Sequence, residues 1–300
     1  MRFGSLETTT TKATLLVVLA GLGFGTMPFF TRSLTEAGMA SYAIEFYRYG
    51  VIVLIFFPSM LNANIRKSTI GWGILAGVLV GFGWIGYSEA LKVAPVASVS
   101  VIYTTYPVFT LLIGWVWFRD KPSRRAVIAS IFIISAGMIG LSPSEFSADH
   151  LPALFMALTA PLTFGLFINI LAHKLWELPP FARIACFSLG AVVGLLPLVA
   201  LSDLEHVVPH NVEGWWLVIG IASLTALIPQ VLYNTFAPVI GAARTSMAGS
   251  IELPTNFLIG WLAFSEAIGP GQWIALLLVI GAILMTPAQS PRKPAAESLP

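Results

Sequence analysis

The sequence predicts an all-α integral membrane protein with ten transmembrane helices arranged as two inverted five-helix repeats. Three observations support this prediction: the scarcity of charge, the length of the apolar segments and a weak internal repeat. Of the 300 residues, 57% are hydrophobic and only 10% are charged, whereas a soluble globular protein carries about 25% charged residues. The mean hydropathy is +0.85. Much of such a surface requires the lipid bilayer as solvent, which excludes a sizeable soluble catalytic domain.

Apolar segments of helical length follow one another along the whole chain, separated by short polar stretches. A membrane-spanning helix needs about 20 apolar residues. The segments are continuous rather than alternating, which excludes the strands of a membrane barrel. We expect spans over residues 13–31, 41–60, 70–91, 97–118, 126–141, 151–171, 181–200, 215–236, 245–264 and 272–286.

The distribution of basic residues around these spans predicts the orientation. Lys and Arg concentrate in cytoplasmic loops. With the N-terminus inside, the cytoplasmic segments hold most of the 16 basic residues, namely Arg2, Lys12, Arg66, Lys67, Arg119, Lys121, Arg124, Arg125, Lys174, Arg183, Arg244, Arg292 and Lys293. Arg32 and Lys92 fall on the other side, and Arg48 falls within a span. We therefore expect a multi-pass cell-membrane protein with both termini cytoplasmic, which would lie in the inner membrane if the source is Gram-negative.

An internal repeat divides the chain into halves. Leu112-Ile113-Gly114-Trp115 recurs as Leu258-Ile259-Gly260-Trp261, and each copy follows a proline and precedes a phenylalanine at similar distances. These flanking residues are Pro107 and Phe118 in the first half, and Pro254 and Phe264 in the second.

The repeat predicts the domain boundaries. We expect a cytoplasmic N-terminal segment over 1–12, a first five-helix repeat over 13–141, a second over 151–286 and a cytoplasmic tail over 287–300. Because five is odd, the second repeat enters the membrane from the opposite side. Inverted repeats with a site at their midplane interface are typical of secondary transporters.

The motifs of both halves resemble those of the drug/metabolite transporter superfamily, specifically its ten-helix EamA-type members. The resemblance is carried by Gly23-Phe24-Gly25, Phe46-Tyr47-Arg48-Tyr49, Tyr87-Ser88-Glu89-Ala90-Leu91, Ala94-Pro95-Val96-Ala97, Pro107 with Gly114-Trp115, Pro254 with Gly260-Trp261, Phe264-Ser265-Glu266, and Gly271-Gln272 leading to Gly281. The sequence departs from the pattern at Asp120, where Glu is typical, and at Phe24, where Trp is usual. The resemblance implies a small-metabolite carrier, often an exporter, that works by alternating access without ATP.

Two charged residues, Glu45 and Arg48, fall inside the second expected span. A charge at a helix centre costs about 2.5–3.5 kcal/mol on insertion scales, so each needs a partner or a function. Their i, i+3 spacing puts them on one face, where they can form an ion pair. Alternatively, Arg48 can receive a substrate carboxylate in bidentate geometry. The resemblance slightly favours the structural ion pair, because arginine is common here among members with different substrates.

Glu252 is the second candidate for a buried charge, in the ninth span and two residues before Pro254. A carboxyl group in a low-dielectric site can exchange a proton at physiological pH, and it can also bind a substrate ammonium group. The structural alternative is a carboxyl group satisfied by Ser246, Ser250 or a neighbouring helix. Glu252 and Glu45 are therefore the candidates for proton coupling.

Aromatic residues recur at helical spacing in the third and fourth spans. Stripes of this kind are more often packing or interfacial belts than ligand sites. Tyrosine hydroxyls in hydrocarbon nevertheless need hydrogen-bond partners, so we expect Tyr87, Tyr103 and Tyr106 to face the interior. A cavity walled by rings suits a flat or amphipathic solute. The substrate-binding candidates are Arg48, Trp84, Tyr87, Tyr103, Tyr106, Phe164 and Tyr233.

Prolines within the expected spans predict kinks. A proline inside a helix removes one backbone hydrogen bond. The residues concerned are Pro28, Pro107, Pro161, Pro229 and Pro254. Kinked helices suit a rocking movement, although static bundles contain them too.

Signatures of metal or nucleotide chemistry are missing from the sequence. It contains no HExxH, P-loop or GxSxG motif, and its single cysteine, Cys186, excludes a disulfide framework. The net charge of +2 is too balanced to indicate nucleic acid binding. We expect no cofactor, and as partners only a small-molecule substrate and the lipid bilayer, with proton coupling as an option. The oligomeric state is not indicated.

Three functions remain to be compared. The leading hypothesis is a secondary carrier that exports amino acids or related amphipathic metabolites. The alternative within the same class is uptake of an aromatic, riboflavin-type vitamin. A membrane-embedded enzyme is disfavoured because the loops are short and hold no catalytic constellation of His, Asp and Ser.

Overall fold

The computed structural model describes residues 10–61, 66–140 and 151–286, and the described residues form helices joined by short connections. The expected N-terminal segment, except for Thr10 to Lys12, and the tail over 287–300 lie outside the described residues. The first half contains α1 (Thr10–Phe24), α2 (Met27–Glu36), α3 (Ser41–Leu61), α4 (Lys67–Leu91), α5 (Val96–Tyr103), α6 (Tyr106–Val116) and α7 (Arg124–Gly140).

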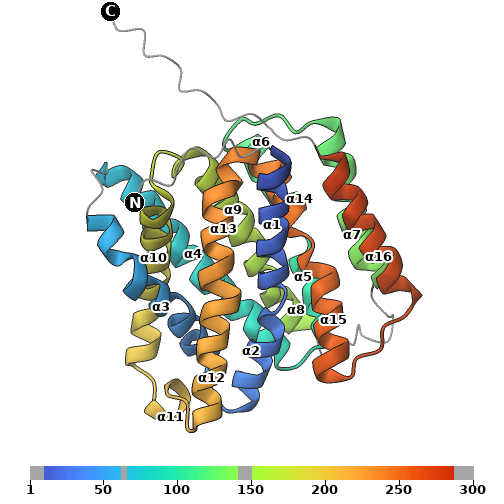
Figure 1. Ribbon diagram of the computed structural model, residues 1–300. Helices are drawn as coiled ribbons and strands as arrows, with labels where there is room; N and C mark the ends of the chain where they lie inside the picture. Colours follow the sequence, from blue (N-terminus) through green and yellow to red (C-terminus); the bar gives the residue numbers. More distant parts are fainter. Residues whose placement is uncertain (1–9, 62–65, 141–150, 287–300) are drawn as a thin grey trace, which may run out of the picture.

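The second half repeats this order. It contains α8 (Leu151–Ala157), α9 (Thr159–His173), α10 (Pro180–Ala200), the short α11 (Leu204–Val207), α12 (Val212–Gly220), the π-helix η3 (Ile221–Leu227), α13 (Ile228–Ile240), α14 (Ala242–Gly249), α15 (Glu252–Phe264) and α16 (Pro270–Met285). In Figure 1, α1–α2 and α8–α9 run in opposite directions, as do α5–α6 and α14–α15. The two halves are therefore inverted repeats.

The described helices account for ten transmembrane segments. Seven stretches are long and apolar enough by themselves, namely Thr10–Glu36, Ser41–Leu61, Lys67–Leu91, Val96–Val116, Pro152–His173, Pro180–Ala200 and Val212–Ile240. The other three are the 17-residue α7, the interrupted pair α14–α15 and the 16-residue α16. The expected spans agree with these helices to within a few residues.

Four of the spans are broken, and each break lies a few residues before a proline. The breaks separate α1 from α2, α5 from α6, α8 from α9, and α14 from α15. Pro28, Pro107, Pro161 and Pro254 lie within the first three residues of the helices that follow. A proline fits the first turn of a helix because the N–H groups there have no intrahelical partner. At these four prolines the expected kinks are therefore helix interruptions, which occupy corresponding places in the two repeats. The fifth, Pro229, is the second residue of α13, which follows η3 without a break.

Helices of the two halves are exchanged between two packed groups. The helix pair α1–α2 packs against η3, α13, α14 and α15, whereas α9 packs against α4 and α6. We call α4, α5, α6, α8 and α9 the first bundle, and α1, α2, η3, α13, α14 and α15 the second bundle. The bundles meet along α6 with α14 and along α5 with α15. Beside them, α3 packs with α10, and α7 packs with α16, on opposite sides of the molecule (Figure 1).

Candidate functional site

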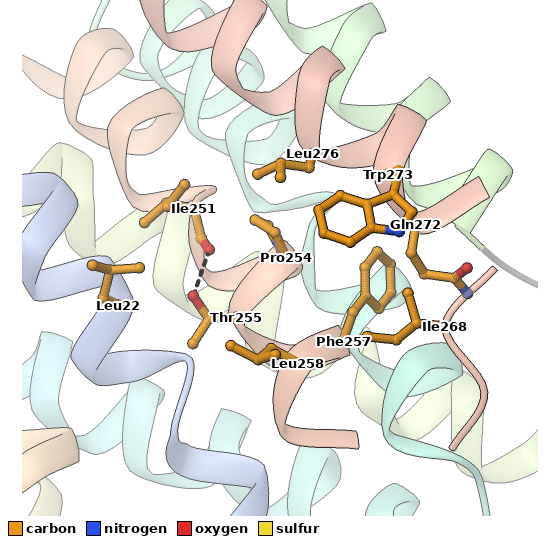
Figure 2. Close-up of a pocket in the computed structure, with 10 residues that line it drawn as sticks. All are labelled: Leu22, Ile251, Pro254, Thr255, Phe257, Leu258, Ile268, Gln272, Trp273 and Leu276. Atoms are coloured by element: carbon orange, nitrogen blue, oxygen red, sulfur yellow. Dashed lines mark hydrogen bonds between the residues drawn. The ribbon is translucent and has the colours of Figure 1, made fainter. Parts of the chain in front are cut away.

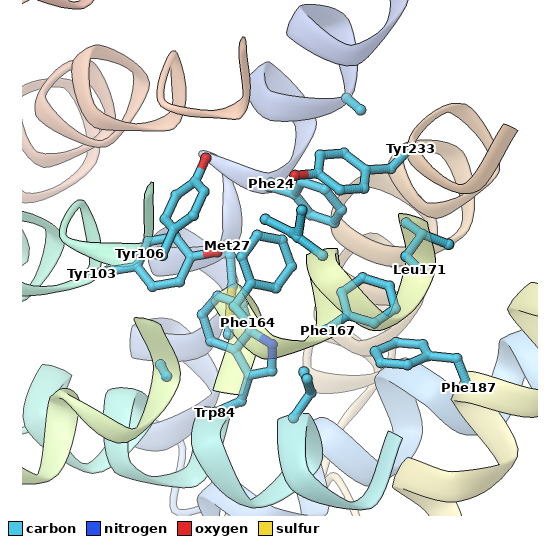
Figure 3. Packing of buried hydrophobic residues seen from close by; sticks show 14 of the residues in the cluster. Phe24, Met27, Trp84, Tyr103, Tyr106, Phe164, Phe167, Leu171, Phe187 and Tyr233 are labelled. Atoms are coloured by element: carbon cyan, nitrogen blue, oxygen red, sulfur yellow. The ribbon is translucent and has the colours of Figure 1, made fainter. Parts of the chain in front are cut away.

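Seven aromatic side chains gather where the two bundles meet, and we call them the central aromatic cluster: Phe24, Trp84, Tyr87, Tyr103, Tyr106, Phe164 and Tyr233. Each is at most 5% exposed. Phe164 lies in the middle, with its ring centroid 5.2 Å from that of Tyr106, 5.8 Å from Tyr103 and 5.9 Å from Tyr233 (Figure 3). The structure thus brings all six aromatic candidates together and adds Phe24.

Several of these rings lie next to helix interruptions. Phe24 is the last residue of α1, and Tyr103 and Tyr106 flank the break between α5 and α6. The rings of Tyr103 and Tyr106 are 5.1 Å apart. Because the helix is interrupted between them, both can point into the bundle instead of following one continuous stripe. The Tyr106 hydroxyl donates to the carbonyl of Ser246 at 2.9 Å, which links α6 to α14.

Arg48 lies at one edge of the cluster and is 1% exposed. Its Nη1 lies 3.0 Å from Oε2 of Glu45, which is fully buried, so the expected ion pair is present. The same nitrogen lies 3.3 Å from the sulfur of Met27. The guanidinium also lies over the Trp84 ring, 5.0 Å from its centroid, so Arg48 joins the ion pair to the aromatic cluster.

The last hydrogen-bond partner of Arg48 is a backbone carbonyl located four residues before a proline. Nη2 donates to the Thr225 carbonyl in η3 at 3.1 Å. In a regular α-helix the N–H four residues later would donate to that oxygen, but Pro229 occupies the position and has no N–H. The carbonyl of Thr225, which lies in the π-helix η3, therefore lacks the α-helical donor at this position and accepts a hydrogen bond from Arg48. This contact ties α3 to the second bundle, while Nε of Arg48 and Oε1 of Glu45 remain buried without a hydrogen-bond partner.

Glu252 approaches the cluster from the first turn of α15 and is 3% exposed. Its carboxyl group interacts with the Tyr103 hydroxyl, whereas Oε1 is buried without a hydrogen-bond partner. The serines considered as partners are engaged elsewhere: Ser246 donates to the carbonyl of Ala243, and Ser250 donates to that of Ser246. The site therefore combines a carboxyl group, one oxygen of which has no hydrogen-bond partner, with a cluster of aromatic rings.

Several buried contacts of the site had no clear signal in the sequence. Met27 and Thr225 both contact Arg48. Each lies in a segment where apolar or hydroxyl residues are abundant, so residue type does not single it out. The position of Thr225 four residues before Pro229 is the one usable indication.

A separate apolar pocket of about 260 Å³ lies between α1, α15 and α16 (Figure 2). It is lined by Leu22, Ile251, Pro254, Thr255, Phe257, Leu258, Ile268, Gln272, Trp273 and Leu276. Trp273 is 63% exposed and Leu258 is 45% exposed. None of the candidate site residues lines this pocket, so it does not belong to the central cluster.

Interrupted helices, inverted repeats and a buried mixed polar and aromatic centre are the architecture of a secondary transporter. The EamA-like transporter family matches residues 11–142 and 151–287, and the chain belongs to this family. It is a membrane transporter and not an enzyme.

Known proteins share the fold and the class. The uncharacterized transporter YojE of Bacillus subtilis is 23% identical over 90% of this chain and 93% of its own length. An S-adenosylmethionine uptake transporter of Rickettsia felis is 22% identical over 81% of this chain and 82% of its own. One crystal structure superposes with a TM-score of 0.71 at 16% identity, covering 92% of this chain and 97% of that one, which shows the same fold.

Proposed function

We propose that this transporter carries an amino acid or a related amphipathic metabolite with a cationic group, bound in the central aromatic cluster. The observation that supports this most directly is Glu252, whose buried Oε1 has no hydrogen-bond partner beside the tyrosine rings. A carboxylate and aromatic faces both attract a cation once water is excluded. A substrate amine would supply the missing hydrogen bond, whereas a sulfonium group would supply only its positive charge.

S-adenosylmethionine is a specific candidate within this class. Relatives in Rickettsia felis and Rickettsia bellii are named as its uptake transporters, at 22% and 23% identity. The molecule has a sulfonium cation, an amino acid group and a flat purine ring. These features match a carboxyl group, the Arg48–Glu45 pair and a cluster of seven rings.

In this proposal, the substrate and proton gradients determine the direction of net transport. An alternating-access carrier without ATP catalyses movement both ways, and the substrate and proton gradients set the net flux. We propose export on the basis of the family resemblance, with both termini cytoplasmic as the basic residues indicate. Uptake is the second candidate, because the Rickettsia relatives are named for it.

Uptake of an aromatic vitamin is a second candidate substrate class, which the number of clustered rings favours. Stacking on aromatic faces would then be the main contact, and Glu252 would contribute little. The two classes therefore differ in their dependence on this one carboxyl group.

Transport into proteoliposomes tests the proposal. Purified protein is reconstituted without nucleotide, and radiolabelled S-adenosylmethionine, aromatic amino acids and riboflavin are supplied in turn. We expect saturable transport of a cationic or zwitterionic substrate, and at least a tenfold loss with Glu252→Gln. Glu89→Gln is the matched control, because Glu89 lies near the end of α4 and is paired with Lys92 at 2.8 Å. Transport of riboflavin alone, unaffected by Glu252→Gln, would refute the amino acid class.

A further inference from the structure

Two acidic residues, Glu266 and Asp120, follow the two copies of the repeated motif and lie at opposite ends of the molecule. At Glu266, the backbone N–H donates to the carbonyl of Gly260 at 3.0 Å, and the preceding Ser265 has a positive φ of 57°. The carboxylate lies 3.5 Å from Nη1 of Arg32 in α2. That guanidinium lies over the Phe264 ring, 4.4 Å from its centroid.

Asp120 repeats this arrangement at the other end. Its N–H donates to the carbonyl of Gly114 at 2.8 Å, and the preceding Arg119 also has a φ of 57°. Oδ2 lies 2.6 Å from Nε2 of His173 at the end of α9. The His173 ring lies 4.7 Å from the Phe118 ring. In both repeats, the motif therefore presents a phenylalanine and an acid to one basic side chain of the same bundle.

The His173 ring has a hydrogen-bonding oxygen beside each of its two nitrogens. Its Nδ1 lies 2.9 Å from the carbonyl oxygen of Asn169, which can only accept a hydrogen bond. Its Nε2 faces the Asp120 carboxyl group. His173 and Asp120 therefore occupy the places that Arg32 and Glu266 occupy in the other repeat.

Each acid also lies beside the start of a helix in the other bundle. Oε1 of Glu266 accepts a hydrogen bond of 3.1 Å from the N–H of Val96, the first residue of α5. Asp120 faces the first two residues of α14, Ala242 and Ala243, across a cavity of about 20 Å³ that all three line. Because α5 and α14 are equivalent helices of the two repeats, each acid lies beside the start of the equivalent half-helix in the other bundle.

We propose that Glu266 and Asp120 are reciprocal latches that join the two bundles at opposite ends of the transport pathway. The basic side chain and the phenylalanine of each bundle hold the carboxylate in place. The carboxylate then binds the free N–H groups at the start of a half-helix in the other bundle, where the helix dipole also favours a negative charge. Alternating access requires the bundles to part at one end while they stay together at the other. The Glu266 latch is formed in this structure.

Simple helix capping is the competing explanation. In that case each carboxylate stabilises only the helix ends that it touches, and its loss affects only its own end of the molecule. A pair of latches predicts a reciprocal effect, because opening one end favours closure of the other. The two explanations therefore differ at the end remote from the substitution.

Hydrogen–deuterium exchange of the full-length protein in lipid nanodiscs measures both ends in one experiment. With Glu266→Ala, we expect faster exchange in α2, α5 and α15, together with slower exchange in α6, α9 and α14. Asp120→Ala should give the opposite pattern. Glu266→Gln retains an accepting oxygen but lacks the charge, so its shift should be smaller than that of Glu266→Ala.

Glu36→Ala is the matched control. Glu36 pairs with the same Arg32 at 3.0 Å but is 62% exposed and lies in the same helix, so its removal should leave both ends unchanged. An increase confined to the mutated end, or an increase at both ends, would overturn the latch proposal. The experiment does not depend on the substrate, so its outcome is independent of the substrate class proposed above.

Discussion

At the scale of single residues, Arg48 connects the parts of the centre that the chain supplies from different spans. Its partners come from α3 itself through Glu45, from α2 through Met27 and from η3 through the Thr225 carbonyl. A guanidinium offers five donors in a fixed plane, so one side chain can serve all three. The pair is therefore a structural joint that borders the proposed binding site.

Removing one member of this pair should be costly to stability. Glu45→Gln leaves Arg48 buried without its counter-ion, and breaking a buried pair in this way costs about 3–5 kcal/mol. The double substitution Glu45→Gln with Arg48→Gln should cost less than the sum of the two single ones. Thermal unfolding of the detergent-solubilised protein measures these differences, with Glu36→Gln as an exposed control expected to change stability by less than about 0.5 kcal/mol. Strictly additive effects would show that the two side chains are not coupled.

Glu252 gives a prediction about pH. A proton and a cationic substrate compete for the same carboxylate, so transport by the wild-type protein should decrease as the pH is lowered. Glu252→Gln has no titratable group there, so its residual transport should be nearly independent of pH. Initial rates in proteoliposomes at a series of pH values test this, with Glu89→Gln as the control. A wild-type pH profile retained in Glu252→Gln would remove Glu252 from proton coupling.

The sequence predicted the charged and tyrosine residues of the central site better than the residues that contact them. Charges and tyrosines are rare in apolar spans, and their burial carries a large energetic penalty, so Glu45, Arg48 and Tyr103 were identifiable from type and spacing alone. Met27 and Thr225 were not, because contacts of a sulfur or a backbone carbonyl leave no distinctive residue type. Their roles follow from the packing of α2 and η3, which a single sequence does not contain.

At the scale of elements, hydropathy predicted where the spans lie but not where they break. Transfer energy depends on side-chain polarity. The breaks fall at Gly25-Thr26, Thr104-Thr105, Leu158 and Ser250-Ile251, and Gly, Thr and Ser also occur inside unbroken helices of this chain, so they do not mark a break by themselves. The prolines marked the neighbourhood of each break, although they predicted kinks. The helices break instead of kinking because each half-helix makes tertiary contacts of its own.

Close packing between α4 and α10 gives a prediction at this scale. A Cβ added to Gly77 would lie 1.9 Å from the carbonyl oxygen of Phe187, and one added to Gly190 would lie 2.1 Å from that of Ile74. Gly77→Ala should therefore force the helices apart and cost about 1–3 kcal/mol. Gly50→Ala is the control, since no atom lies within 4 Å of its added Cβ and alanine favours the helix by about 0.5–1 kcal/mol. Equal thermal stability of the two variants would contradict the close approach.

At the scale of the whole molecule, the exchange of α1–α2 and α9 between the bundles makes the two halves interdependent. The sequence repeat indicated two units that follow each other along the chain. The structure instead forms each bundle from helices of both halves. Which helices of a repeat pack with their own half depends on surface complementarity among ten similar apolar helices, and periodicity does not encode that choice.

This exchange predicts how the separated halves behave. A fragment ending after α7 lacks α9, so the faces of α4 and α6 that α9 covers would be exposed to lipid, and Asn169 would no longer donate to the Thr110 carbonyl at 2.9 Å. We expect the fragments 1–145 and 146–300 to be degraded when expressed alone, and to accumulate as a co-purifying, transport-competent pair when expressed together. Size-exclusion chromatography and proteoliposome transport measure this, and a full-length chain cleaved after residue 145 serves as the positive control. A first-half fragment that is stable as a monomer, with the helix content of its share of the intact protein, would show that the exchanged helices do not hold the halves together.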